Sequence, residues 1–139
     1  MEKKPVKPVK PKAQSEKPEG ELVLQSVAMP ADTNAYGDIF GGWIVSQMDL
    51  GGAVLANQKA HNRVTTVAIE RMAFIKPVFV GDLVCCFAEK IKTGNSSITI
   101  KIQVWVKRLR LGELEQVTEG IFTYVAIDEK RRPKVINWQ

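Results

Sequence analysis

The sequence predicts an α+β fold in which an antiparallel sheet of five strands wraps around one long central helix. Two observations predict it. Residues 40–59 contain no proline and are apolar on nearly every side, which is typical of a buried helix. Residues 96–108 alternate between apolar and polar side chains, which marks a strand with one buried face. The chain has 139 residues, enough for one domain built around one such core.

The elements follow one another in a simple order. A short first strand begins near Glu21, and turn-forming residues from Met29 to Gly37 make the loop before the helix. Four strand-like segments come after the helix, at residues 64–76, 82–92, 96–108 and 117–127. We expect these four strands to pair as a meander, with a hairpin at Gly94-Asn95. One helix enclosed by an antiparallel sheet is the hotdog architecture.

Composition sets the limits of the domain and excludes several classes of function. Residues 1–20 are rich in lysine and proline and predict an extended arm, residues 21–130 hold the hotdog domain, and residues 131–139 look like a C-terminal tail. No stretch approaches the roughly 18 consecutive apolar residues of a membrane span, and no apolar segment of a secretory signal follows the basic N-terminus. We therefore expect a cytoplasmic protein that does not insert into membranes.

The formal net charge of +5 does not by itself indicate a nucleic-acid-binding protein. Residues 1–20 carry six lysines and three glutamates, so the arm accounts for most of the excess. A basic arm binds polyanions weakly through counterion release, but Lys/Pro segments are more often simply solvated. Nucleic acid is therefore not an expected partner.

Cysteine and histidine usage gives no sign of a metal or redox site. Cys85 and Cys86 are adjacent, and neighbouring residues of a strand point to opposite faces, which prevents an easy disulfide. His61 is the only histidine, is remote from both in sequence and is expected to be a polar residue at the helix end. We expect neither a metal nor a cofactor.

The start of the helix is the first candidate for chemistry. Gly41 and Gly42 stand where the first turn begins, and the opening N–H groups of a helix have no intrahelical partners. Glycine there lets a ligand approach the backbone, so these amides suit a developing thioester oxyanion. The alternative is that the two glycines merely allow tight packing of a buried helix.

Asp49 is the second candidate, because it is a carboxylate in the middle of an apolar helix. Buried carboxylates are costly unless they are paired or used in function. The functional interpretation is a general base for water or a nucleophile on a thioester carbonyl. The alternatives are a core aspartate satisfied by hydrogen bonds and an aspartate that faces solvent.

Helix geometry separates the two candidates. Gly42 and Asp49 are seven residues apart, so they share a face but stand roughly 10.5 Å apart along the axis. One carbonyl group cannot reach both within a single helix. Two antiparallel helices related by a two-fold axis bring Gly42 of one copy to Asp49 of the other, which predicts a shared site in a dimer.

Two polar residues precede the helix. Asn34 is placed to orient water or to donate to the carbonyl, although asparagine is also a common turn residue. Asp38 is expected to cap the helix N-terminus or to interact with its dipole, with a role as base as the alternative.

Taken together, these residues resemble a known family, the YciA-type bacterial acyl-CoA thioesterases. The resemblance covers residues 21–128 and is carried by the segment from Ala28 to Trp43, by Ser46-Gln47-Met48-Asp49, and by the motifs Phe74-Ile75-Lys76-Pro77, Val80-Gly81-Asp82, Val84-Cys85-Cys86, Gly94-x-Ser96-Ser97-Ile98 and Val104-Trp105-Val106-Lys107. It does not include the N-terminal arm. Tyr36 departs from the pattern, because a smaller or polar residue is expected there; a tyrosine would narrow the acyl entrance.

The resemblance implies a hotdog fold, hydrolysis of acyl-CoA to CoA and a free acid, and a trimer of hotdog dimers without a metal or cofactor. It implies that Asp49 is the catalytic carboxylate, that Asn34 is its partner across the dimer, and that the Gly42 N–H lies in the oxyanion hole. The implied substrate contacts are Phe40, Gly41, Thr65, Lys76, Gly94, Ser96, Ser97, Lys107 and Arg108.

Three other functions compete with this interpretation. A hotdog dehydratase needs a catalytic histidine near the helix start, where this sequence has none. A non-catalytic acyl-CoA-binding or sensing protein would keep the glycine turn without needing Asp49. A nucleic-acid binder acting through its arm would lose salt-dependent binding when residues 1–20 are deleted.

Overall fold

The computed structural model describes residues 16–108 and 112–138. Its elements are β1 (Glu21–Val27), the short 3-10 helix η1 (Pro30–Asp32), α1 (Gly41–Ala60), β2 (Val64–Phe74), β3 (Leu83–Thr93), β4 (Ser97–Lys107) and β5 (Leu114–Ala126). The predicted arm at residues 1–20 lies mostly outside the described residues. In the part that is described, no helix is both long and apolar enough to cross a bilayer.

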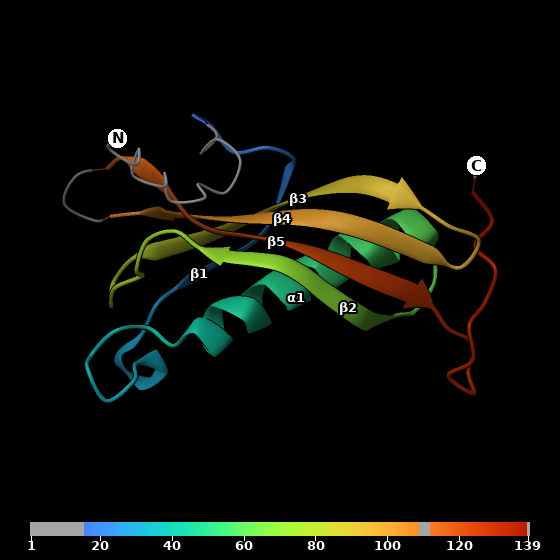
Figure 1. Ribbon diagram of the computed structural model, residues 1–139, viewed down its shortest axis with the longest axis horizontal. Helices are drawn as coiled ribbons and strands as arrows, with labels where there is room; N and C mark the ends of the chain where they lie inside the picture. The colour runs from blue at the N-terminus through green and yellow to red at the C-terminus, as the bar shows by residue number, and fades with distance from the viewer. Residues whose placement is uncertain (1–15, 109–111, 139) are drawn as a thin grey trace, which may run out of the picture.

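The five strands form one antiparallel sheet in the order β1-β3-β4-β5-β2, and α1 lies across one face of it (Figure 1). The predicted hotdog fold is confirmed. The predicted meander of four strands is wrong, because β2 pairs with β5 and not with β3. Only β3, β4 and β5 form a meander, and β2 lies at an edge of the sheet. Pairing between distant strands is decided by the whole sheet and not by their order in the chain.

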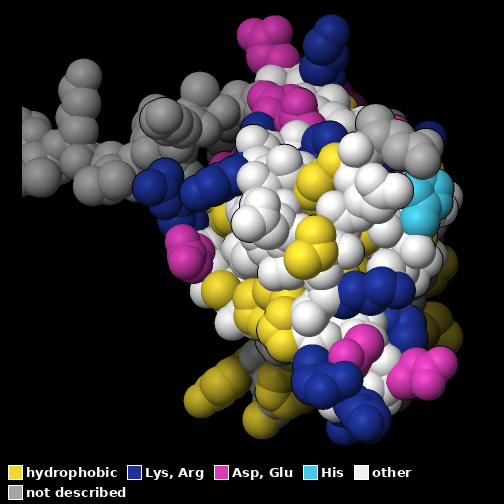
Figure 2. Space-filling view, turned by 90° about the vertical axis from the view of Figure 1, so that its right-hand side faces the viewer, with side chains coloured by type: hydrophobic (Ala, Val, Ile, Leu, Met, Phe, Trp, Pro, Cys, Tyr) yellow, Lys and Arg dark blue, Asp and Glu magenta, His cyan; other side chains and the backbone are white. Residues whose placement is uncertain are grey.

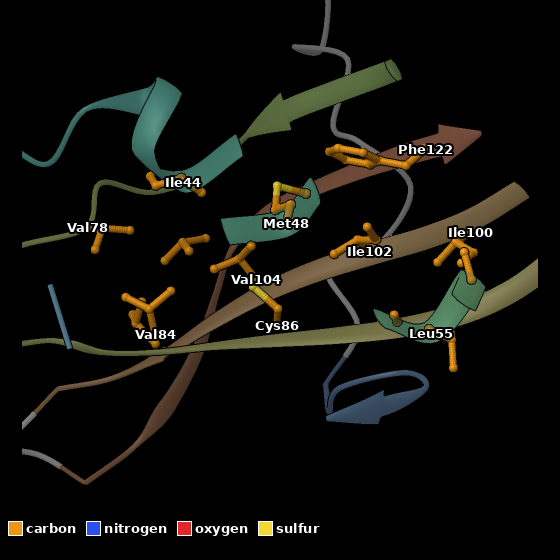
Figure 3. Close-up of a cluster of buried hydrophobic side chains, with 14 of the residues drawn as sticks. Ile44, Met48, Leu55, Val78, Val84, Cys86, Ile100, Ile102, Val104 and Phe122 are labelled. Carbon is orange, nitrogen blue, oxygen red and sulfur yellow. The ribbon is translucent and has the colours of Figure 1, made fainter. Parts of the chain in front are cut away.

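The core fills the space between α1 and the sheet. One face of β4 supplies a row of buried aliphatic side chains, as the alternating pattern predicted, and β5 adds Phe122 and Tyr124. Ile44, Met48 and Leu55 of α1 pack against this layer (Figure 3). Burial of this apolar surface is the main favourable contribution to the stability of the fold.

The helix is buried on one side only. Leu50 and Val54, one turn apart, keep 57% and 43% of their surface exposed. The expectation of a helix covered all round is therefore not met by one chain, because a five-stranded sheet covers a single side of the helix. We call Leu50 and Val54 the outer face of α1.

Cys85 and Cys86 form no disulfide and are buried in β3. The pKa of Cys86 is raised to about 12, mainly by burial of its thiol and to a lesser extent by the neighbouring Cys85.

The C-terminal segment, which was predicted to be a tail, packs on the domain. Ile136 is buried and donates its N–H to the Asn95 carbonyl oxygen (2.8 Å), and Trp138 Nε1 donates to the Gly94 carbonyl oxygen (2.9 Å).

Candidate active site

Helix α1 begins with free amides. Its first backbone hydrogen bond runs from the Ile44 N–H to the Phe40 carbonyl oxygen (3.3 Å), so the amides of Gly41 and Gly42 precede the bonded turns. Phe40 is the N-cap and gives no side-chain cap, so the prediction that Asp38 caps the helix is wrong: Asp38 lies too far before the first turn. Apart from its chain neighbours and the nearby backbone of the helix itself, no atom of the described chain lies within 4 Å of the position that a Cβ of Gly42 would take. The surface beside this glycine is therefore open to a ligand.

Asn34 holds the loop before the helix in shape. Its Oδ1 accepts hydrogen bonds from the Tyr36 N–H (2.9 Å) and the Asp38 N–H (3.2 Å), and its own N–H donates to the Asp38 carbonyl oxygen (2.7 Å). This is the local turn bonding that asparagine favours. The Nδ2 group has no hydrogen-bond partner in residues 16–108 and 112–138, so it is the part of Asn34 that is available to a ligand.

Asp49 is half-buried in the middle of α1 and is held through one oxygen. Its Oδ1 accepts hydrogen bonds from Thr66 Oγ1 on β2 (2.6 Å) and from Tyr124 Oη on β5 (3.2 Å). Within the described chain its Oδ2 has no hydrogen-bond partner. The carboxylate is therefore both anchored, as a satisfied core aspartate would be, and supplied with one free oxygen for chemistry.

Thr66 and Tyr124 were not found from the sequence. Thr66 on β2 contacts Asp49, and its neighbour Thr65 points to the opposite side of the strand. The expected contact of Thr65 with the substrate stays a prediction. Thr65 is exposed on β2. The sequence Val-Thr-Thr-Val-Ala-Ile of residues 64–69 does not alternate between apolar and polar side chains, so it gave no signal for which threonine faces the helix. Burial and the nearby Asp49 carboxylate raise the pKa of Tyr124, so its hydroxyl stays protonated.

The other expected substrate contacts lie at two opposite ends of the sheet. Gly94, Ser96 and Ser97 form the turn between β3 and β4, whereas Lys107 ends β4. Ten residue steps of β4 separate the two ends by roughly 33 Å. Within one chain the structure does not bring these groups together. Figure 2 faces the end that carries the turn, where basic and acidic side chains are interspersed and form no single patch.

Arg108 and Lys76 have partners at the other end of the sheet. The Arg108 guanidinium pairs with Asp82 and with Glu115 (3.2 Å) and donates to the Pro77 carbonyl oxygen (3.1 Å). Lys76 Nζ lies 3.3 Å from Glu115 Oε1. Arg108 is therefore bound mainly to the protein itself, while Lys107 is exposed.

Apolar side chains lie beside the helix start. Phe40 is 52% exposed, and a Cβ added to Gly41 would meet the Phe74 ring at 3.5 Å. Phe40 and Gly41 were both expected near the substrate, and this surface suits an acyl chain or pantetheine arm. Tyr36 is almost fully exposed in the preceding loop.

Nothing in the described residues resembles a metal centre. No group of three or more His, Cys, Asp or Glu side chains gathers there. His61 is the C-cap of α1, in a left-handed conformation (φ 50°), as a residue that ends a helix often is.

The comparison with known proteins identifies the family. The model of the thioesterase superfamily matches residues 36–113, which include α1 and Asp49. The chain belongs to the thioesterase superfamily. Among its relatives, the acyl-CoA thioester hydrolase YciA of Salmonella typhimurium is 56% identical over 120 residues, covering 84% of this chain and 90% of the relative. YciA of Escherichia coli K12 is 52% identical over 122 residues, covering 86% and 92%.

Solved structures of this superfamily agree. The hexameric thioesterase of Yersinia pestis superposes with a TM-score of 0.84 at 56% identity, over 87% of this chain and 99% of that one. The resemblance to YciA-type thioesterases seen in the sequence is confirmed.

Proposed function

We propose that this thioesterase hydrolyses acyl-CoA to a free carboxylic acid and CoA, with Asp49 as the catalytic carboxylate. The observation that carries the proposal is the arrangement of Asp49, which is fixed through Oδ1 and leaves Oδ2 free. The names of the relatives support acyl-CoA as the substrate. No cofactor is needed beyond the CoA that belongs to the substrate.

Two routes are compatible with this arrangement. In the first, Asp49 takes a proton from water, the water oxygen bonds to the thioester carbonyl carbon, and the C–S bond breaks. In the second, Asp49 itself bonds to that carbon, the thiolate leaves, and water then hydrolyses the anhydride. In both routes the departing CoA thiolate is protonated, and the Gly42 N–H stabilises the negative charge on the carbonyl oxygen.

The proposed site is shared by two copies of the chain. Gly42 and Asp49 are separated by seven residues of a continuous helix, roughly 10.5 Å along its axis, so one carbonyl group cannot reach both in one copy. An antiparallel second helix supplies Gly42 and the Asn34 Nδ2 group to Asp49 of the first copy. The hexameric relative supports assembly into a trimer of such dimers.

The exposed apolar surface favours the same dimer. The outer face of α1 lies on the same side of the sheet as Ile69, which pairs with the core residue Phe122 and yet is 42% exposed. β2 is also an edge strand, with one side of its backbone unpaired within the described chain. A second copy that covers this surface explains why the helix is apolar on nearly every side.

The decisive experiment replaces Asp49 with alanine and measures the release of free thiol from acyl-CoA. We expect turnover to be lost while CoA still binds and the fold is kept. Undiminished thiol release in Asp49→Ala would refute the assignment. A wild-type protein that binds acyl-CoA without any thiol release would instead identify the alternative, a non-catalytic acyl-CoA-binding protein.

A further inference from the structure

Tyr124 reaches from the sheet to the helix at the point where Asp49 lies. It is fully buried on β5, and its Oη lies 3.0 Å from the Asp49 backbone oxygen and 3.2 Å from Asp49 Oδ1. A stacked contact with Phe122, with ring centroids 6.4 Å apart, fixes the ring. A buried hydroxyl needs a partner, and the single proton of this one is shared between the backbone oxygen and the side-chain Oδ1 of Asp49.

Gly52 makes that approach possible. A Cβ at this position would lie 2.2 Å from Tyr124 Oη and 2.5 Å from Ile102 Cδ1. Glycine in a helix interior lowers helix stability, so its presence calls for a reason in packing. Admission of the Tyr124 hydroxyl to the helix backbone is such a reason. Gly52 and Tyr124 therefore act as a pair.

The pair determines which oxygen of Asp49 is free. Thr66 on β2 and Tyr124 on β5 both donate to Oδ1, and in the described chain Oδ2 receives no hydrogen bond. Two donors on one oxygen restrict rotation of the carboxylate about its terminal torsion, which is otherwise broad. A general base or nucleophile works best when its reacting atom is held in place.

We infer that Tyr124, admitted by Gly52, is a positioning residue that holds Asp49 Oδ1 and so directs Oδ2 toward the thioester. This inference rests on the proposed catalytic role of Asp49. Tyr124 itself touches no reacting atom. Its effect should therefore appear in the chemical step and not in the affinity for acyl-CoA.

The test is Tyr124→Phe, which removes one hydroxyl and keeps the ring. We expect kcat for thiol release to fall about tenfold, the scale of one lost hydrogen bond to a charged group, with KM within about twofold of wild type. Thr123→Val is the matched control, because it removes a hydroxyl of the same strand that faces Thr99 (3.4 Å), and it should leave kcat unchanged. An unchanged kcat in Tyr124→Phe, or a raised KM alone, would overturn the inference.

Gly52→Ala provides a second, independent measurement. In the wild-type background the added methyl group displaces the Tyr124 hydroxyl and kcat should fall; in the Tyr124→Phe background the same change should cost less, because the nearest clash is gone. An equal loss of kcat in both backgrounds would contradict the inference that Gly52 and Tyr124 act as a pair. Asp49→Asn, measured alongside, separates the two claims: inactive Asp49→Asn with fully active Tyr124→Phe overturns only the inference, whereas active Asp49→Asn overturns the proposed function as well.

Discussion

Replacing Val54 with glutamate tests whether a second copy of the chain covers the outer face of α1. In a single chain Val54 is 43% exposed, so a carboxylate there reaches water and costs less than about 0.5 kcal/mol of folding free energy. In the proposed dimer the same carboxylate is buried. The loss of apolar burial is then about 1 kcal/mol per copy, and burying an unpaired charge adds several kcal/mol more.

Because a two-fold dimer contains the substitution twice, its dissociation constant should rise by a factor on the order of 1,000 or more. Sedimentation velocity measures the change in assembly, thiol release measures activity, and circular dichroism shows whether each variant is folded. Val135→Glu is the matched control, because Val135 is 75% exposed in the C-terminal segment, and it should change none of the three. A Val54→Glu protein that keeps the wild-type assembly and activity would refute the shared site.

Two further predictions concern stability and reactivity. Arg108→Ala should lower the free energy of unfolding by about 3–5 kcal/mol, because it leaves the buried Asp82 carboxylate without its cation. Thermal denaturation measures the loss, with Lys107→Ala as the control because the Lys107 side chain is exposed. Equal melting temperatures of the two variants would contradict the prediction. Because the pKa of Cys86 is raised to about 12, on the order of one Cys86 side chain in ten thousand should be a thiolate at pH 8. Iodoacetamide should therefore leave Cys86 unmodified in the folded protein and label it after denaturation. Labelling of the native protein would contradict this prediction.

Local patterns predicted the elements well and their pairing less well. The helix was expected at residues 40–59 and runs from Gly41 to Ala60, because an uninterrupted apolar stretch between glycines and His61 is a local signal. The position of β2 beside β5 was missed, since no local pattern records which distant strand is the neighbour. The exposure of the outer face of α1 was missed for the same reason, because it depends on how much of the helix the assembled sheet covers.

The candidate site shows the same division. Asp49 and Gly42 were singled out because each is unusual where it stands: a carboxylate in an apolar helix and a glycine at a helix start. Asn34 is a common kind of turn residue, and the resemblance to the family assigned it as the partner of Asp49. The two hydroxyl groups that donate to the Asp49 carboxylate belong to residues 17 and 75 positions away in the sequence, and nothing near those residues marks their role. Only the three-dimensional arrangement identifies Thr66 and Tyr124 as partners of this carboxylate.

The central claim is that each site takes Asp49 from one copy and Asn34 from another, and subunit mixing tests it most directly. Asn34→Ala and Asp49→Ala proteins, each inactive alone, are mixed under conditions where exchange of subunits is demonstrated with two differently labelled populations. A dimer of the two kinds contains one intact site, so thiol release should recover to roughly a quarter of the wild-type rate, since random pairing makes half of the dimers mixed. Complete exchange without any recovery of thiol release would contradict the shared site.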